Sequence, residues 1–205
     1  MNFRLMQNLV VALCLVLAFS AKAGLPEAKT FMTDLVQLAQ KSKAQEGKAD
    51  SQSDAQVKAL SDRVDFAALA KKSLGARWAK TPLGERNDFL KTLQELLESV
   101  VYPNAKKIAV KPEDLDYKIA PKNPNQVNVI GHVTREKNGE MVNQSLEVGL
   151  IYDPKTQKIT DAVIEGEVLS QNLKRQFTEA LKKKTFAQII EKMKKRVNEA
   201  RNPKS

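Results

Sequence analysis

The strongest constraint on the fold is a change of hydrophobic period partway along the chain. Up to about residue 102, apolar residues recur at helical spacing, whereas from residue 114 to residue 167 they alternate with period two. Helical spacing returns after residue 170. This order of helices, strands and helices predicts an α+β domain in which helices cover one face of a curved antiparallel sheet.

Turn signals divide the alternating region into about four strands. The tripeptides Lys137-Asn138-Gly139 and Asp153-Pro154-Lys155 favour tight turns, so the last three strands should form an antiparallel meander. Such a sheet usually leaves one face for a core. The expected strands are residues 114–120, 126–135, 141–152 and 158–167.

Capping residues and prolines place five amphipathic helices around these strands. The expected starts are Pro26, Asp65, Thr81-Pro82, Ser170 and Thr185. Gly75 is suited to end the second helix, and Tyr102-Pro103 should close the third. The polar segment 41–56 should be a mobile linker or a frayed helix.

Residues 1–23 have the pattern of a cleavable secretory signal. Arg4 provides a positive charge, an apolar run extends over residues 9–19, and Ser20-Ala21-Lys22-Ala23 is an A-x-A cleavage pattern. Cleavage after Ala23 would leave residues 24–205 as one exported domain. An uncleaved anchor is the alternative, but this run is about half of the roughly 20 residues that a transmembrane helix needs.

Charge and cysteine usage narrow the classes of partner and chemistry. The only cysteine, Cys14, lies in the apolar run, so the exported chain would have no disulfide, thiolate metal site or cysteine nucleophile. Removing Arg4 and Lys22 lowers the formal net charge from +10 to +8. This balance favours anionic lipid headgroups or an acidic protein face as partners, and export argues against nucleic acid.

Many of the basic residues gather in the C-terminal helices. They form either an ordinary solvated helix face or a docking surface for an anionic membrane or an acidic partner. The residues are Lys174, Arg175, Lys182, Lys183, Lys184, Lys192, Lys194, Lys195, Arg196 and Arg201.

The sequence offers no convincing catalytic, metal or cofactor site. The only histidine, His132, lies within an expected strand and has no metal-binding motif around it. Asp161, Glu165 and Glu167 alternate onto one strand face, as paired glycosidase carboxylates can, but no aromatic platform accompanies them. We therefore expect a protein that is not an enzyme and holds no metal or cofactor.

Three stretches of the chain carry a family resemblance. They are Val64-Asp65-Phe66 through Leu74-Gly75-Ala76-Arg77-Trp78, Glu85-Arg86-Asn87-Asp88-Phe89 through Leu96-Leu97, and Asp161-Ala162-Val163-Ile164-Glu165-Gly166 through Asn172 and Phe177. In this order they resemble the toluene-tolerance (MlaC-like) family of periplasmic phospholipid-binding proteins. The chain departs from the family pattern in three ways: no tryptophan precedes Asp161, Leu173 stands where an aromatic is common, and Glu167 replaces an apolar residue.

The resemblance implies an NTF2-like fold that binds phospholipid acyl chains between sheet and helices. It also implies a carrier that shuttles lipid between an inner-membrane ABC transporter with its MCE-domain partner and an outer-membrane lipoprotein complex, which maintains outer-membrane lipid asymmetry. A diacyl lipid exposes about 30 methylenes, each worth roughly 0.8 kcal/mol in water, so a carrier must enclose the tails almost completely. Two chains require a cavity near the upper end of the roughly 300 to 1,000 Å³ range of ligand pockets, or beyond it.

The expected cavity wall combines inward-facing strand residues with apolar helix residues, any of which can instead be ordinary core. The strand candidates are Val127, Val129, Val133, Leu146, Val148, Leu150, Ile164 and Val168. The helix candidates are Phe66, Leu69, Phe89, Leu93, Leu97 and Phe177, with Trp78 and Tyr102 expected at the mouth. Two other functions stay open: an interaction module or chaperone that binds peptide in the same groove, and a hydrolase that uses His132.

Overall fold

The computed structural model describes residues 24–44, 51–102, 111–137 and 140–202, without the side chains of residues 41–53 and 132–144. The expected signal segment 1–23 and most of the turn at residues 137–139 lie outside these ranges. No helix in the described ranges is long and apolar enough to cross a membrane.

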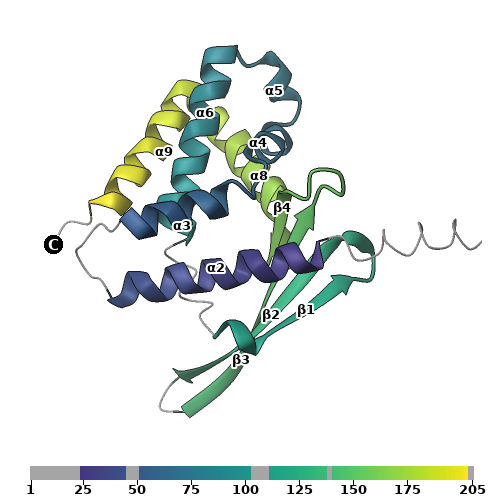
Figure 1. Ribbon diagram of the computed structural model, residues 1–205. Coiled ribbons are helices and arrows are strands. Elements are labelled where there is room, and N and C mark those ends of the chain that lie inside the picture. The colour runs from purple at the N-terminus through teal and green to yellow at the C-terminus, as the bar shows by residue number, and fades with distance from the viewer. Residues whose placement is uncertain (1–23, 45–50, 103–110, 138–139, 203–205) are drawn as a thin grey trace, which may run out of the picture.

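Helices from both ends of the chain flank an antiparallel sheet, which confirms the α+β class (Figure 1). In the described part the sheet has five strands, where about four were expected. The strands are β1 (Leu115–Ala120), β2 (Asn123–Lys137), β3 (Glu140–Tyr152), β4 (Ile159–Ile164) and β5 (Glu167–Val168). The longer helices are α2 (Leu25–Ala44), α3 (Ser51–Ser61), α4 (Phe66–Leu74), α6 (Leu83–Leu96), α8 (Leu169–Leu181) and α9 (Phe186–Arg201). Short helical segments are α5 (Ala76–Lys80), the π-helical turn η2 (Leu97–Val101) and the 3₁₀ turn η4 (Pro112–Asp114).

The sheet is a meander in which each strand pairs with the next one along the chain. The expected fourth strand, residues 158–167, is wrong in one respect, because it is a hairpin rather than one strand. Glu165 and Gly166 both have positive φ angles, 52° and 80°, as a two-residue type I′ turn between β4 and β5 requires. Glycine adopts this backbone conformation without steric cost, so Gly166 is suited to the turn.

Local capping signals were good predictors of where some helices begin. Asp65 caps α4 by accepting a hydrogen bond from the Ala68 amide at 2.8 Å. Thr185 and Gln188 form a capping box at the start of α9. Of the two alternatives expected for residues 41–56, a mobile linker or a frayed helix, helix is present at both ends, since α2 continues to Ala44 and α3 begins at Ser51.

Two expected caps are wrong because their side chains bond elsewhere. Ser170 lies in the first turn of α8, after the extended Val168, and its hydroxyl donates to the buried Asp161. The Thr81 hydroxyl donates backward to the Arg77 carbonyl at 2.9 Å, so Thr81 ends α5, and α6 begins after Pro82.

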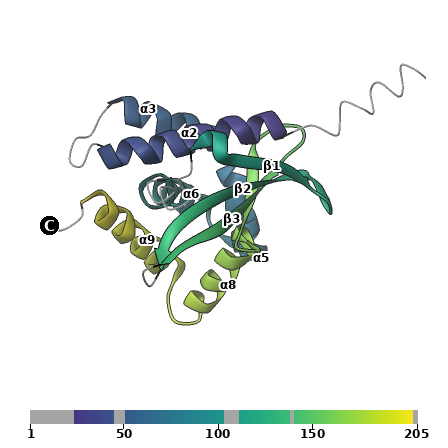
Figure 2. The same cartoon turned by 90° about the horizontal axis from the view of Figure 1, so that it is seen from below.

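Two apolar clusters form the core. The sheet cluster lies between α2 and the inner face of the sheet, and it includes the fully buried Met32 and Val127. The helix cluster lies between α4, α6, α8 and α9, and it includes the fully buried Phe89. Viewed from below, α2 and α3 lie on one side, α8 and α9 on the other, and α6 lies between them (Figure 2). The half-buried Leu97, where α6 passes into η2, packs against both clusters.

Candidate functional site

An apolar cavity of about 370 Å³ lies where the two clusters meet. Its wall comes from α2, α4, the η2 segment, β3, β4 and the start of α8. The lining residues are Phe31, Leu35, Val64, Leu69, Leu97, Val100, Val101, Tyr102, Val148, Leu150, Ile159, Thr160, Asp161, Ala162, Ile164 and Leu169. Nearly all are aliphatic or aromatic, so the cavity favours an apolar ligand.

The sheet side of the wall follows from strand register. Val148 pairs with Ile164 and Leu150 pairs with Ala162 across the antiparallel β3–β4 ladder. Residues two apart on a strand face the same side, and directly paired residues share that side. The register therefore places these four apolar side chains on one surface, and that surface is the cavity wall.

The opposite side of the wall depends on the π-helical turn at the end of α6. The Tyr102 amide donates to the Leu97 carbonyl five residues earlier, which inserts an extra residue into the turn. This segment contributes four lining residues, Leu97, Val100, Val101 and Tyr102. Short π-helical turns are frequent at functional sites.

Two lining residues mark the opening of the cavity to solvent. Val101 is 44% exposed and Ile164 is 43% exposed, which is unusual for large apolar side chains. Tyr102, expected at the mouth, is instead only 4% exposed. Trp78 is half-buried against the helix cluster and does not line the cavity.

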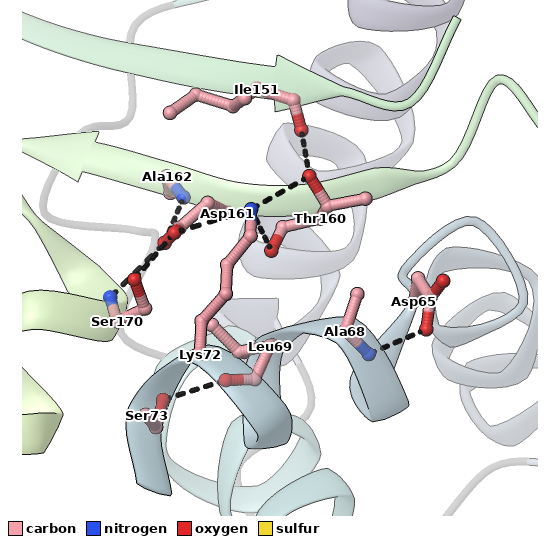
Figure 3. A network of polar contacts seen from close by, with 10 residues as sticks. All are labelled: Asp65, Ala68, Leu69, Lys72, Ser73, Ile151, Thr160, Asp161, Ala162 and Ser170. Carbon is pink, nitrogen blue, oxygen red and sulfur yellow. Dashed lines mark hydrogen bonds and ion pairs between the residues drawn. The ribbon is translucent and has the colours of Figure 1, made fainter. Parts of the chain in front are cut away.

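A polar network fixes the seam between the sheet and the helices beside the cavity (Figure 3). The Asp161 side chain on β4 is 3% exposed, and its carboxylate accepts from the Ser170 amide at 3.0 Å and the Ser170 hydroxyl at 2.6 Å. Lys72 on α4 donates to the Thr160 hydroxyl at 3.1 Å, and its Nζ lies 3.6 Å from Asp161 Oδ2. Because the Asp161 carboxylate is satisfied by these partners, it can remain buried at an apolar cavity.

Tyr102 contributes a further buried polar group to the wall, in addition to Asp161. Its hydroxyl is buried and has no hydrogen-bond partner within the described residues, while the nearby Ser61 hydroxyl donates to Glu98 at 2.7 Å. Burial raises the pKa of Tyr102 to about 12, from an ordinary value of 10.0. The phenol is therefore a neutral group at physiological pH and presents a mainly apolar ring to the cavity.

The cavity brings together only part of the residue set that the sequence suggested. Six candidates line it: Leu69, Leu97, Tyr102, Val148, Leu150 and Ile164. Phe89, Leu93 and Phe177 belong to the helix cluster, and Val127 and Val129 belong to the sheet cluster. Phe66, Leu146 and Val168 are partly buried away from the cavity, and the side chain of Val133 lies outside the description.

Sequence reasoning missed the contribution of α2 and of the segments that flank the sheet. The missed apolar lining residues are Phe31, Leu35, Val64, Val100, Val101, Ile159, Ala162 and Leu169. Phe31 and Leu35 lie in the amphipathic helix that the sequence predicts to begin at Pro26, but helical periodicity does not show which element its apolar face contacts.

The described residues show no arrangement suited to metal binding. No group of three or more histidine, cysteine, aspartate or glutamate side chains converges in the part of the chain that the structure describes. Of the three carboxylates singled out on the fourth strand, Asp161 is held by Ser170, while Glu167 pairs with Arg175 at 2.9 Å. Glu165 lies exposed in the β4–β5 turn.

Comparison with known proteins gives a matching family model and several similar solved structures. The model of the family described as "MlaC protein" matches residues 29–195. A solved structure of a phospholipid-binding protein from Ralstonia solanacearum, in complex with a phospholipid, has 19% sequence identity and a TM-score of 0.58. The match covers 87% of this chain and 99% of that one, and it supports the fold. Among curated proteins no match was found.

Proposed function

Since this chain belongs to the MlaC family, we propose that it binds phospholipid by holding acyl chains in the cavity between its two clusters. The observation that carries this proposal is an almost wholly apolar wall that opens to solvent at Val101 and Ile164. The phospholipid complex of the similar Ralstonia solanacearum protein supports it. Apolar chains gain about 0.8 kcal/mol for each methylene removed from water, so such a wall is sufficient to hold them.

The size of the cavity bears on how a lipid is held. About 370 Å³ lies near the lower end of the roughly 300 to 1,000 Å³ range of ligand pockets, whereas two acyl chains call for its upper end. A diacyl lipid therefore requires the walls to move apart. Separation along the seam between the helix cluster and the sheet would enlarge the cavity without disrupting either cluster.

We also propose a wider role, which the family and the N-terminal pattern support. Residues 1–23 would direct export and be removed, leaving residues 24–205 as one lipid-binding domain in the periplasm. There the protein would carry phospholipid between an inner-membrane ABC transporter with its MCE-domain partner and an outer-membrane lipoprotein complex. This transfer would maintain the lipid asymmetry of the outer membrane.

Two other functions can be separated from this one by what occupies the cavity. A chaperone or interaction module would hold peptide in the same groove. A hydrolase would need a polar cavity around His132, whereas the wall described here is almost entirely aliphatic and aromatic. We therefore propose a carrier that is not an enzyme and needs no metal or cofactor.

The primary test is native mass spectrometry of the protein purified from a bacterial periplasm without detergent. We expect discrete added masses that match phospholipids, which lipid extraction would then identify. Added peptide mass would support the chaperone instead. A bare protein mass that stays unchanged after incubation with phospholipid vesicles would refute the proposal.

A second test fills the cavity with a larger side chain and compares lipid binding with that of a surface variant. Ala162 lines the cavity, and Ala162→Phe would place a ring where the acyl chain should lie. We expect lipid affinity to fall about tenfold or more, equal to about 1.4 kcal/mol, with little change in stability because the ring enters existing space. Ala67→Phe is the control, since Ala67 is exposed on α4. Equal lipid retention by both variants would contradict the assigned site.

A further inference from the structure

On one surface of the molecule, nearly all of the charged side chains are basic. Residues 66–80, which form α4 and α5, and residues 169–185, which form α8 and its connection to α9, contain a single acidic residue, Glu179. The basic residues of these two segments are named here the basic face. They are Lys71, Lys72, Arg77, Lys80, Lys174, Arg175, Lys182, Lys183 and Lys184.

The two segments are adjacent in space, so the basic face is continuous. The Lys174 side chain of α8 lies against Gly75 at the end of α4. A Cβ atom added at Gly75 would lie 3.3 Å from Lys174 Nζ. The Arg77 guanidinium of α5 lies 5.5 Å from the ring centroid of Phe186, the first residue of α9. Arg77 therefore lies close to the three lysines that precede α9.

Most of this charge is not neutralised locally. Five exposed lysines of the basic face, Lys71, Lys80, Lys174, Lys183 and Lys184, have no acidic side chain at ion-pair distance among the residues that the structure describes.

The basic residues of α9 differ in this respect. Lys194 pairs with both Asp88 and Glu191, and Lys195 and Arg196 both lie within 4 Å of Glu199. Three of the five basic residues of α9 are therefore paired, and in the described part of the chain only Lys192 and Arg201 of this helix lack an acidic side chain at ion-pair distance. On the basic face the proportion is reversed, since only Lys72, Arg175 and Lys182 are paired there.

The composition of the basic face distinguishes a membrane from a protein as its partner. Protein interfaces carry a central group of aromatic and other large apolar residues and are depleted in lysine. The large exposed hydrophobic residues of the described structure, Leu83, Val101 and Ile164, all lie outside the two segments of the basic face. Flexible, unpaired lysines without an apolar centre fit a fluid array of phosphate charges instead.

We propose that the basic face adsorbs to anionic phospholipid bilayers. The face also reaches the cavity, because Lys72 bonds to the lining residue Thr160, and Leu69 of α4 and Leu169 of α8 line the cavity themselves. Adsorption thus brings the cavity wall close to lipid headgroups. The adsorption itself depends only on the surface charge and does not require lipid in the cavity.

The test compares two charge-matched variants in binding to vesicles made of equal parts phosphatidylglycerol and phosphatidylcholine. One variant, K71Q/K174Q/K183Q, removes three unpaired charges from the basic face. The control, K192Q/K195Q/R196Q, removes three charges from exposed positions of α9. With a factor of about five for each lysine near an anionic surface, we expect the first to reduce partitioning on the order of 100-fold and the control only a few-fold.

The ionic strength and the lipid composition of the vesicles should also change binding. Binding should weaken strongly as ionic strength rises, since the Debye length shortens to about 8 Å at 0.15 M, and pure phosphatidylcholine vesicles should bind poorly. Equal losses in both variants would show that net charge alone matters and would overturn the proposal. Failure of the unaltered protein to bind at low salt would also overturn it and point to an acidic protein as the partner. Native mass spectra recorded in parallel would show cavity occupancy, so adsorption by a protein that never holds lipid would refute only the proposed function.

Discussion

The two apolar clusters have similar compositions but different degrees of closure. In the helix cluster, Phe89 is fully buried and packs against Phe177 and Phe186, each with ring centroids 5.4 Å away. The sheet cluster contributes much of the cavity wall, and the hydroxyls of Tyr102, Tyr117 and Tyr152 within it have no hydrogen-bond partner among the described residues. One cluster uses its apolar surface for packing, whereas the other leaves part of that surface available to a ligand.

This difference has an energetic consequence for mutations. Removing a side chain from a closed cluster creates a void, which adds a cavity cost to the lost transfer free energy. Removing one that already borders empty space enlarges an existing cavity and forfeits fewer contacts. Stability should therefore depend mainly on the helix cluster, and ligand binding on the sheet cluster.

The largest expected effect is the loss of Phe89. Phe89→Ala should lower the free energy of unfolding by about 3–5 kcal/mol, whereas Leu150→Ala, in the cavity wall, should cost about 2 kcal/mol. Urea unfolding of both variants measures the difference. If the Leu150 variant were destabilised as much as the Phe89 variant, the sheet cluster would be as tightly closed as the helix cluster, and the comparison would fail.

A smaller effect is expected at the seam that joins the two regions. Asp161→Asn should cost about 2 kcal/mol, because the buried carboxylate accepts from the Ser170 amide and hydroxyl and lies near Lys72. Lys72→Met should cost less than about 1 kcal/mol, since the Lys72 side chain is 43% exposed and its pairing is screened by water. Unfolding in urea tests both variants, and a larger loss in Lys72→Met would show that the lysine rather than the hydrogen bonds to Ser170 holds the seam.

Local signals explain why much of the fold could be predicted from the sequence. Asp65 and Thr185 cap helices by bonding to amides three residues away, so the signal and the structure lie in the same short segment. The meander likewise follows from period-two alternation and turn residues. Ser170 was misassigned because its partner, Asp161, is nine residues away on another element.

The cavity could be predicted only in part, because a core residue and a lining residue share one composition. Val127 and Val148 lie on neighbouring strands and looked equivalent, yet Val127 is fully buried in the sheet cluster and Val148 lines the cavity. What separates them is the position of α2 and of the π-helical turn. Neither the direction in which a helix packs nor one extra residue in a turn has a signature in hydrophobic period.

The smallest expected effect at neutral pH concerns Tyr102, which belongs to the sheet cluster and lines the cavity. At neutral pH, Tyr102→Phe should change the free energy of unfolding by less than about 1 kcal/mol, since the lost hydroxyl has no partner. At alkaline pH, the raised pKa of Tyr102 should affect the free energy of unfolding. The pKa of Tyr102 is raised to about 12 from 10.0 by burial, so between these pH values the unfolded chain releases a proton that the folded protein retains.

The folded state then binds more protons, and stability must fall as pH rises from 10 to 12, by up to about 1.4 kcal/mol per pH unit from this group. Tyr102→Phe should make that decline shallower but not abolish it, because burial also raises the pKa of Tyr152 and Tyr117. Urea unfolding at a series of alkaline pH values measures the slope. An unchanged slope would mean that the Tyr102 hydroxyl reaches water in solution, and the cavity would then be wetter on the sheet-cluster side than its wall indicates.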